Sequence, residues 1–249
     1  MCSSDLGHLN KGFKPVHWCM DCGSALAEAE VEYQDKTSPA VDVAFDLVDP
    51  SALQAICGQD LEGLRPSIPI WTTTPWTLPA NLAVCLHPEL EYSVVRVGDR
   101  ALVVAEALRE SVLARLDGAE PAASVLGSCS GADLDKLALQ HPFYDRQVPV
   151  LMGEHVTVEA GTGAVHTAPG HGLDDFLIGQ VNGLEVLNPV GGNGVFVPGT
   201  PLVEGLHVFK ANDVIVDHMR VLGVLLHVDD YGHSYPHCWR HKTPVIFRA

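Results

Sequence analysis

Two histidines lie within one short, glycine-rich segment, residues 161–175, which reads G-T-G-A-V-H-T-A-P-G-H-G-L-D-D. Glycine lets the backbone approach a ligand closely and proline fixes a turn, so the segment predicts a strand that ends near Thr167 and then a shaped loop. The imidazoles of His166 and His171 beside carboxylates suit acid–base or metal chemistry. A single histidine in a strand is more often a core residue than a catalyst, so it is the cluster that indicates a site.

The carboxylates of this segment belong to Asp174 and Asp175, at the start of a predicted helix that ends near residues 182–183. Acidic side chains are favoured there by the helix dipole and by capping, so simple capping is the alternative to a functional role for this pair.

Potential metal ligands lie near both ends of the sequence. Cys19 and Cys22 form a C-x-x-C pair, and Cys238 and His241 form a C-x-x-H pair. This spacing lets each pair present two ligands to one tetrahedral zinc ion. Because four ligands leave no open position, we predict a structural site that clasps the two ends of the chain.

Two alternatives stay open for these residues, namely unrelated buried thiols and a redox-active C-x-x-C. His17 and His237 are substitutes for the fourth ligand, so the three cysteines are the firmer part of the predicted set.

A third cluster, residues 71–81, reads W-T-T-T-P-W-T-L-P-A-N. Its candidate side chains are Trp71, Thr72, Thr73, Thr74, Thr77 and Asn81. Hydroxyl and amide groups both donate and accept hydrogen bonds, so they can hold a ribose, an ester carbonyl or a water molecule. Threonine-rich strands are common, but beside the histidine and aspartate segment this one predicts a hydrolytic pocket.

Composition restricts the class of protein. A chain of 249 residues with 47% hydrophobic and 18% charged residues is globular. The sequence contains neither an apolar run long enough to span a bilayer nor a signal peptide, and its seven cysteines favour reduced thiols. We therefore expect a cytoplasmic protein without a membrane partner. A net charge of -16 disfavours extensive contact with nucleic acid, so such contact should be local.

Hydrophobic periodicity predicts the elements that position these clusters. Strands are expected at residues 39–48, 67–74, 92–97 and 101–105, helices at 105–116 and 213–222, and a long shaped loop at 188–199. Many short strands with few helices predict a mixed α/β, barrel-like sheet.

Three motifs together resemble one family. W-T-T-T-P-W-T-L-P-A-N, G-T-G-A-V-H-T-A-P-G-H-G-x-D-D and the terminal S-Y-P-H-C-W-R-H-K-T-P are similar to the bacterial isoleucyl-tRNA synthetases, in the connective-peptide insertion that carries their editing site. The resemblance extends from about residue 7 to residue 249. It implies a β-barrel-like editing domain with surrounding helices over residues 37–226, and a zinc-clasp base made of residues 7–36 and 227–249.

The resemblance also implies an activity, which is hydrolysis of the ester of valine mischarged onto tRNA(Ile), with valyl-adenylate as a further substrate. A missing methylene is worth only about 1 to 3 kcal/mol in a binding pocket, so a second site must remove the smaller product. The partners implied are the 3′ acceptor end of that tRNA and the remainder of the synthetase, without DNA. No cofactor is implied for hydrolysis, and zinc is implied only as a structural ion.

The resemblance also implies roles for individual residues, assigned by their positions in the shared motifs. Asp175 resembles the anchor of the substrate ammonium, and His166 resembles the histidine that lines the amino-acid pocket and excludes isoleucine. The hydroxyl wall that would hold the terminal adenosine and orient water consists of Thr72, Thr73, Thr74, Thr77 and Asn81. Trp71, His171 and Asp174 are added as substrate-binding residues.

The sequence departs from a whole synthetase in three ways. It lacks the nucleotide-binding signatures H-I-G-H and K-M-S-K-S, so ATP binding and ligase activity are expected only of the parent enzyme. It stops at I-F-R-A, and residues 1–6 are expected to be non-native because C-S-S-D-L matches a translated sequencing adapter. Two other functions stay open: a metallohydrolase using His166, His171 and Asp175, and a tRNA-docking module that is inactive when isolated.

Overall fold

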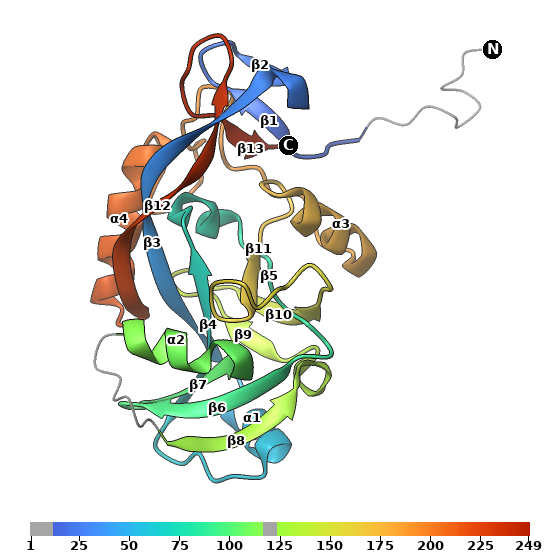
Figure 1. Ribbon diagram of the computed structural model, residues 1–249, viewed down its shortest axis with the longest axis vertical. Helices are drawn as coiled ribbons and strands as arrows, with labels where there is room; N and C mark the ends of the chain where they lie inside the picture. Colours follow the sequence, from blue (N-terminus) through green and yellow to red (C-terminus); the bar gives the residue numbers. More distant parts are fainter. Residues whose placement is uncertain (1–11, 117–123) are drawn as a thin grey trace, which may run out of the picture.

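The computed structural model describes residues 12–116 and 124–249. The predicted non-native residues 1–6 lie outside this part of the chain. Two sheets of very different size make up the structure, joined by a long two-stranded ribbon (Figure 1).

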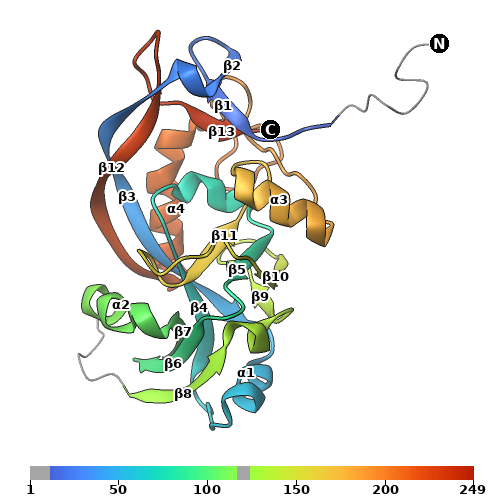
Figure 2. The same cartoon turned by 45° about the vertical axis from the view of Figure 1, so that its right-hand side comes forward.

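The smaller sheet brings the two ends of the described chain together. Its three antiparallel strands are, in spatial order, β13 (Ile246–Arg248), β1 (Val16–Cys19) and β2 (Ser24–Leu26). His17 lies at the centre, opposite Phe247 on one side and Leu26 on the other. We call this sheet the clasp base, and it lies at one end of the molecule in both views (Figures 1 and 2).

The larger sheet is mixed and contains ten strands of the described chain. Its path runs through β11 (Ala164–Thr167), β5 (Ala83–Leu86), β10 (Gln147–Met152), β9 (Ala138–Gln140), β3 (Val31–Leu47), β4 (Arg65–Thr72), β7 (Arg100–Ala105), β6 (Glu91–Val97) and β8 (Val125–Ser130), while β12 (Leu225–Cys238) pairs with β3 beside this path. The pairs β10–β5 and β4–β7 are parallel and the others are antiparallel. The strands predicted at residues 39–48, 67–74 and 92–97 correspond to β3, β4 and β6.

The predicted barrel-like closure is wrong, although the mixed α/β class is confirmed. The sheet curls until β11 packs against β4, but β11 forms its ladder with β5, and the last strands of the path, β11 and β8, do not pair. A barrel requires its terminal strands to share a ladder, so this sheet stays open.

The ribbon that joins the two sheets is formed by β3 and β12. These strands pair from Val31 opposite Cys238 to Val43 opposite Leu225, with one shift of register between Leu225 and His227. The domain boundaries expected after residues 36 and 226 therefore fall inside two unbroken strands. Through this ribbon the clasp base continues into the larger sheet without a flexible linker.

Helices cover the open sheet and its ends. The α-helices are α1 (Pro50–Cys57), α2 (Arg109–Arg115), α3 (Leu173–Asn182) and α4 (Val208–Val221). The 3-10 helices are η1 (Glu28–Glu30), η2 (Pro75–Ala80), η3 (Glu106–Leu108) and η4 (Gly131–Leu134). None of the helices in residues 12–116 and 124–249 is long and apolar enough to cross a bilayer.

Helix α4 begins five residues before the predicted start at residue 213. The imidazole Nδ1 of His207 accepts a hydrogen bond from the backbone N–H of Phe209, so His207 caps the helix. Histidine is an uncommon cap, and the sequence pattern therefore favoured a later start at K-A-N-D. The earlier start places Asn212 inside the helix, where it is 8% exposed.

Candidate functional site

The pairing of β5 with β11 brings the threonine segment to the histidine segment. Strand β4 ends at Thr72, η2 follows, and β5 then runs antiparallel to β11 with Val84 opposite His166. The backbone N–H of Leu82 donates to the carbonyl of Thr167 at 2.9 Å, which extends this ladder to the end of the threonine segment. Two clusters separated by about ninety residues in the sequence thus share one ladder.

Thr77 and His166 are in direct contact at the centre of the site. The hydroxyl of Thr77 lies 3.0 Å from Nε2 of His166 and 2.8 Å from the carbonyl oxygen of Thr74. A carbonyl oxygen can only accept, so the Thr77 hydroxyl donates to Thr74 and accepts from His166. His166 therefore carries its proton on Nε2.

The ring of His166 is neutral and keeps one free acceptor. Burial lowers its pKa to about 4, with a further contribution from the nearby His171. Its second nitrogen, Nδ1, is buried without a hydrogen-bond partner in the described chain. A buried unpaired acceptor is costly in a stable core and is typical of a position that meets a ligand or a water molecule.

Asp175 faces the loop that follows β11. Its Oδ2 accepts a hydrogen bond of 2.9 Å from the backbone N–H of Ala168. Gly172 makes room for this carboxylate, since a Cβ atom there would lie 2.9 Å from Oδ2 of Asp175. Burial raises the pKa of Asp175, and the Ala168 hydrogen bond opposes that rise.

His171 lies between the site loop and the clasp base. Its Nδ1 is 2.9 Å from the carbonyl oxygen of Phe247, which must accept, so the proton is on Nδ1 and Nε2 is a free acceptor. The ring packs edge-on against Trp76, with centroids 5.2 Å apart. Burial lowers the pKa of His171 to about 4, so this imidazole is also neutral near pH 7.

The other polar side chains that the sequence predicted for the site take no part in the contact between Thr77 and His166. The hydroxyls of Thr72 and Thr74 lie 3.2 Å apart at the end of β4, and Thr73 between them is partly exposed. The side chain of Asn81 is fully buried and donates to the carbonyl of Ala83, so it holds the turn into β5. Asp174 is exposed on the first turn of α3.

Trp71 lines a cavity of about 300 Å³ beside the end of β4. Its ring packs edge-on against Tyr231, with centroids 5.1 Å apart. The guanidinium of Arg115 also lines this cavity, held by both carboxylate oxygens of Asp42 and by the carbonyl of Gly161. Since residue 161 begins the segment that enters β11, this cavity adjoins the strand that carries His166.

Three residues that were not predicted hold η2 in place. Asn212 of α4 accepts from the backbone N–H of Trp76 at 3.0 Å, and Nε2 of His141 donates to the carbonyl of Leu78 at 2.9 Å. Arg146 donates to the carbonyl of Asn81 at 2.7 Å. Nothing in the local sequence around these three side chains indicated such a role, because each acts on a backbone group more than sixty residues away.

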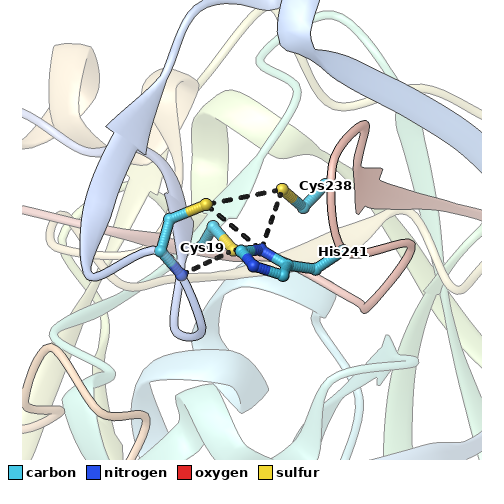
Figure 3. A group of neighbouring side chains, drawn as sticks. Cys19, Cys238 and His241 are labelled. Atoms are coloured by element: carbon cyan, nitrogen blue, oxygen red, sulfur yellow. Dashed lines mark hydrogen bonds between the residues drawn. The ribbon is translucent and has the colours of Figure 1, made fainter.

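The predicted metal ligands form one cluster in the clasp base. The ligand atoms of Cys19, Cys22, Cys238 and His241 all lie within 4.8 Å of one another. Nδ1 of His241 is 3.2 Å from the sulfur of Cys22 and 3.8 Å from each of the other two sulfurs. Figure 3 shows Cys19, Cys238 and His241 pointing toward a common centre. Three thiols and one imidazole match, in number and type, the donor set of a structural zinc site.

The two substitute ligands considered above point elsewhere. Nδ1 of His237 donates to the carbonyl of Tyr235 at 2.8 Å, and His17 packs edge-on against Phe247. Burial opposes ionisation of Cys238, but backbone N–H groups that face its sulfur, with His241 and Cys19, lower its pKa to about 6. Burial raises the pKa of the neighbouring Cys22 to about 11, so the case for a metal site rests on the convergence of the four ligand atoms.

A family model and individual relatives both relate this chain to the tRNA synthetases. A family model described as tRNA synthetases class I (I, L, M and V) matches residues 3–239. The chain is 59% identical over 246 residues to an isoleucine–tRNA ligase of Alkalilimnicola ehrlichii, and 60% identical over 247 residues to that of Halorhodospira halophila. Each match covers 98% of this chain and 26% of the relative, so the chain spans about a quarter of their length.

Solved structures share the fold at low sequence identity. The P. knowlesi cytosolic leucyl-tRNA synthetase editing domain has a TM-score of 0.62 and 10% identity, covering 78% of this chain and 97% of that one. The GlLeuRS-CP1 crystal structure has a TM-score of 0.61 and 14% identity, covering 76% and 99%.

Proposed function

The chain belongs to the class I tRNA synthetases of the isoleucine, leucine, methionine and valine group, and from that premise we propose that it is the editing domain of an isoleucine–tRNA ligase. The proposed reaction is hydrolysis of the ester that joins valine to the 3′ end of tRNA(Ile), with valyl-adenylate as a second substrate. The observation that carries this proposal is the buried contact between Thr77 and His166, which joins the two segments that the resemblance assigns to one pocket.

Size selection is assigned to His166. Its ring is held in β11 by the ladder to β5 and by the hydroxyl of Thr77, so it cannot rotate away without breaking a buried hydrogen bond. A rigid wall can reject the extra methylene of isoleucine, whereas a mobile wall would adapt to it. Because the imidazole is neutral, it does not repel the substrate ammonium.

Recognition of the ammonium is assigned to Asp175. Within the described residues only its Oδ2 has a hydrogen-bond partner, the N–H of Ala168, which leaves Oδ1 for the substrate. A charge-assisted hydrogen bond in a partly dry site is stronger than a neutral one. Every aminoacyl ester carries this ammonium, so Asp175 contributes binding and orientation, and selectivity comes from His166.

The adenosine and the attacking water are assigned to the threonine side of the site. The paired hydroxyls of Thr72 and Thr74, with Thr73, can orient water or a ribose hydroxyl. The cavity beside Trp71 and Tyr231 offers an aromatic surface on which an adenine base can stack. Asn81 shapes the turn, since its Nδ2–H donates to the carbonyl of Ala83, while its buried Oδ1 has no partner in the described chain and can accept from the substrate or a water molecule.

A structural zinc ion is assigned to the clasp base, where Cys19, Cys22, Cys238 and His241 would hold it. A metallohydrolase using His166, His171 and Asp175 is less favoured. In residues 12–116 and 124–249 these three side chains do not bring their ligand atoms together as the four clasp ligands do.

The test is deacylation of matched valyl and isoleucyl esters of tRNA(Ile) by the full chain. We expect the valyl ester to be hydrolysed and the isoleucyl ester to survive. A net charge of -16 predicts weak, salt-dependent binding of the tRNA, so low salt and high substrate concentrations are required. Equal loss of both esters would contradict the assignment of a size-selective pocket, and no loss of either would favour the inactive docking module.

A further inference from the structure

We propose that His171 is a positioning residue that ties the loop of the pocket to the clasp base, so that the geometry of the pocket depends on that base. This inference rests on the proposed function, and it assigns the clasp base a role beyond joining the chain ends. The observation is the hydrogen bond of 2.9 Å from Nδ1 of His171 to the carbonyl of Phe247 in β13.

The loop that His171 anchors is short and leads directly into α3, which carries Asp175. The backbone N–H of His171 donates to the carbonyl of Ala168 at 2.8 Å, and the N–H of Ala168 donates to Asp175. The anchor therefore acts on the residue that orients Asp175. Gly170 in the same loop packs so closely on the carbonyl of Leu187 that a Cβ atom would lie 2.0 Å away, which leaves the loop little freedom to adjust.

The imidazole suits this role because its donor is fixed. A neutral ring has one N–H, and the carbonyl of Phe247 requires it on Nδ1. The side chain is 9% exposed and packs against Trp76 of η2, so the ring also touches the threonine side of the pocket. His171 thus links three parts of the molecule: the site loop to which it belongs, η2 through its ring packing, and β13 through its hydrogen bond.

Other bonds from the clasp base reach a different loop. Nε1 of Trp18 donates to the carbonyl of Gly192 at 2.7 Å, and Nε of Arg248 donates to the carbonyl of Val190 at 3.1 Å. These residues follow α3 and lie outside the site loop. They provide a matched control, because breaking one of them weakens the attachment of the base without touching His171.

The experiment compares three variants of the full chain by amide hydrogen exchange and by steady-state deacylation of the valyl ester. His171→Ala removes the anchor, His171→Asn keeps a donor near the position of Nδ1, and Trp18→Phe removes the control bond to Gly192. In His171→Ala we expect faster exchange at the amides of Ala168 and His171 and a kcat lowered about 10-fold to 100-fold, with KM changed less, because misplacement by about 1 Å has effects of that size.

His171→Asn should restore both the slow exchange and most of kcat, and Trp18→Phe should leave both unchanged. The proposal is overturned if His171→Asn is as defective as His171→Ala, or if His171→Ala leaves exchange at Ala168 unchanged. Exchange does not require turnover, so a chain that hydrolyses neither ester but shows the expected exchange pattern would count against the proposed function while supporting the anchor.

Discussion

The clasp base and the pocket around His166 both gather polar side chains, but with very different amounts of packing. Around the clasp cluster the buried hydrophobic residues are Cys19, Cys238 and Val245, with Cys22 and Leu26 partly buried beside them. The pocket instead lies on the larger sheet, whose core includes long runs from β3, β4, β6 and β7. The base also packs against the larger core through Trp18 and Ile246. Its own core is small, so it is not stable alone in water, whereas the larger sheet has a core of its own.

This difference indicates what holds each region together. In the clasp base, four ligands at C-x-x-C and C-x-x-H spacing are the main candidates for the stabilising element. In the pocket, hydrogen bonds from several elements fix neutral groups whose spare acceptors, Nδ1 of His166 and Nε2 of His171, have no partner in the described chain. The base should therefore respond strongly to loss of a metal ligand, and the pocket to changes of individual hydrogen bonds.

The largest expected effect is in the clasp base. Cys238→Ser should abolish zinc binding and unfold the base, because apparent free energies of zinc binding in small structural sites are about 10 to 16 kcal/mol. Zinc content by atomic absorption and proteolysis within residues 12–36 would measure this. Cys57→Ser is the control, since Cys57 is partly buried in α1 outside the cluster. Full zinc content in Cys238→Ser would contradict the view that these four ligands hold the clasp base together.

The sequence predicted the clasp base better than the pocket, because the clasp ligands are close together in the sequence and the pocket residues are not. The four clasp ligands were predicted because the two members of each pair are three positions apart in the sequence. Spacing alone therefore identifies the C-x-x-C and C-x-x-H pairs as potential ligands. The adjacency of Thr77 and His166 depends on the pairing of β5 with β11, which no local pattern encodes. The chemistry of the two segments suggested one hydrolytic pocket and the family resemblance assigned both to one site, but no strand pattern predicted the contact itself.

Other features of the structure were outside the reach of sequence patterns. Periodicity located β3, β4 and β6, but it could not show that the sheet stays open, because closure depends on which strands become partners. It also placed the start of α4 too late, since the cap is the imidazole of His207. The donors that hold η2, among them His141 and Arg146, act on distant backbone groups that a sequence does not identify.

Acid should weaken the larger sheet through its buried histidines. The pKa of His166 and of His171 is lowered from 6.5 to about 4, and that of His141 to about 3. The unfolded chain takes up protons below pH 6.5 while the folded chain stays neutral, so the free energy of unfolding falls as the pH drops from 6.5 to 4. Each of the first two histidines should contribute about 3 kcal/mol to that fall.

Urea unfolding followed by tryptophan fluorescence at pH 7.5, 5.5 and 4.5 would measure this effect. His166→Gln removes one of the titrating groups, so its stability should fall less steeply with acid than that of the unaltered chain. Identical slopes for the two proteins would show that His166 is not the buried neutral group described here.

Asp175→Asn should have the next largest effect, and on hydrolysis rather than on folding. Loss of the carboxylate removes the proposed partner of the ammonium, and a buried charge pair of this kind is worth about 2 to 5 kcal/mol, so kcat/KM for the valyl ester should fall roughly 100-fold or more. Asp174→Asn, on the exposed turn of α3, should cost far less. Similar losses in the two variants would indicate that both aspartates act only as negative charges in the first turn of α3.

The pH profile gives a second test of Asp175. Burial raises the pKa of this carboxyl, and the ammonium is bound by its ionised form, so hydrolysis should fall as acid protonates it and should begin to fall at a higher pH than for an ordinary aspartate. His166 and His171 stay neutral near pH 6.5, so they should cause no further change in the rate of hydrolysis there. A fall in the rate of hydrolysis centred near pH 6.5 would instead indicate that a titrating histidine takes part in the reaction.

The smallest effect expected is that of one hydroxyl. Thr77→Val keeps the shape of the side chain but leaves Nε2–H of His166 without an acceptor, which should cost about 1 to 3 kcal/mol of stability. Because His166 would then be free to rotate, discrimination between valyl and isoleucyl esters should fall about tenfold, consistent with the small energies that separate one methylene. Thr77→Ser keeps the hydroxyl and should retain the discrimination of the unaltered chain. If valine and serine at this position gave the same ratio of kcat/KM for the two esters, the wall of the pocket would owe its rigidity to the β5–β11 ladder alone.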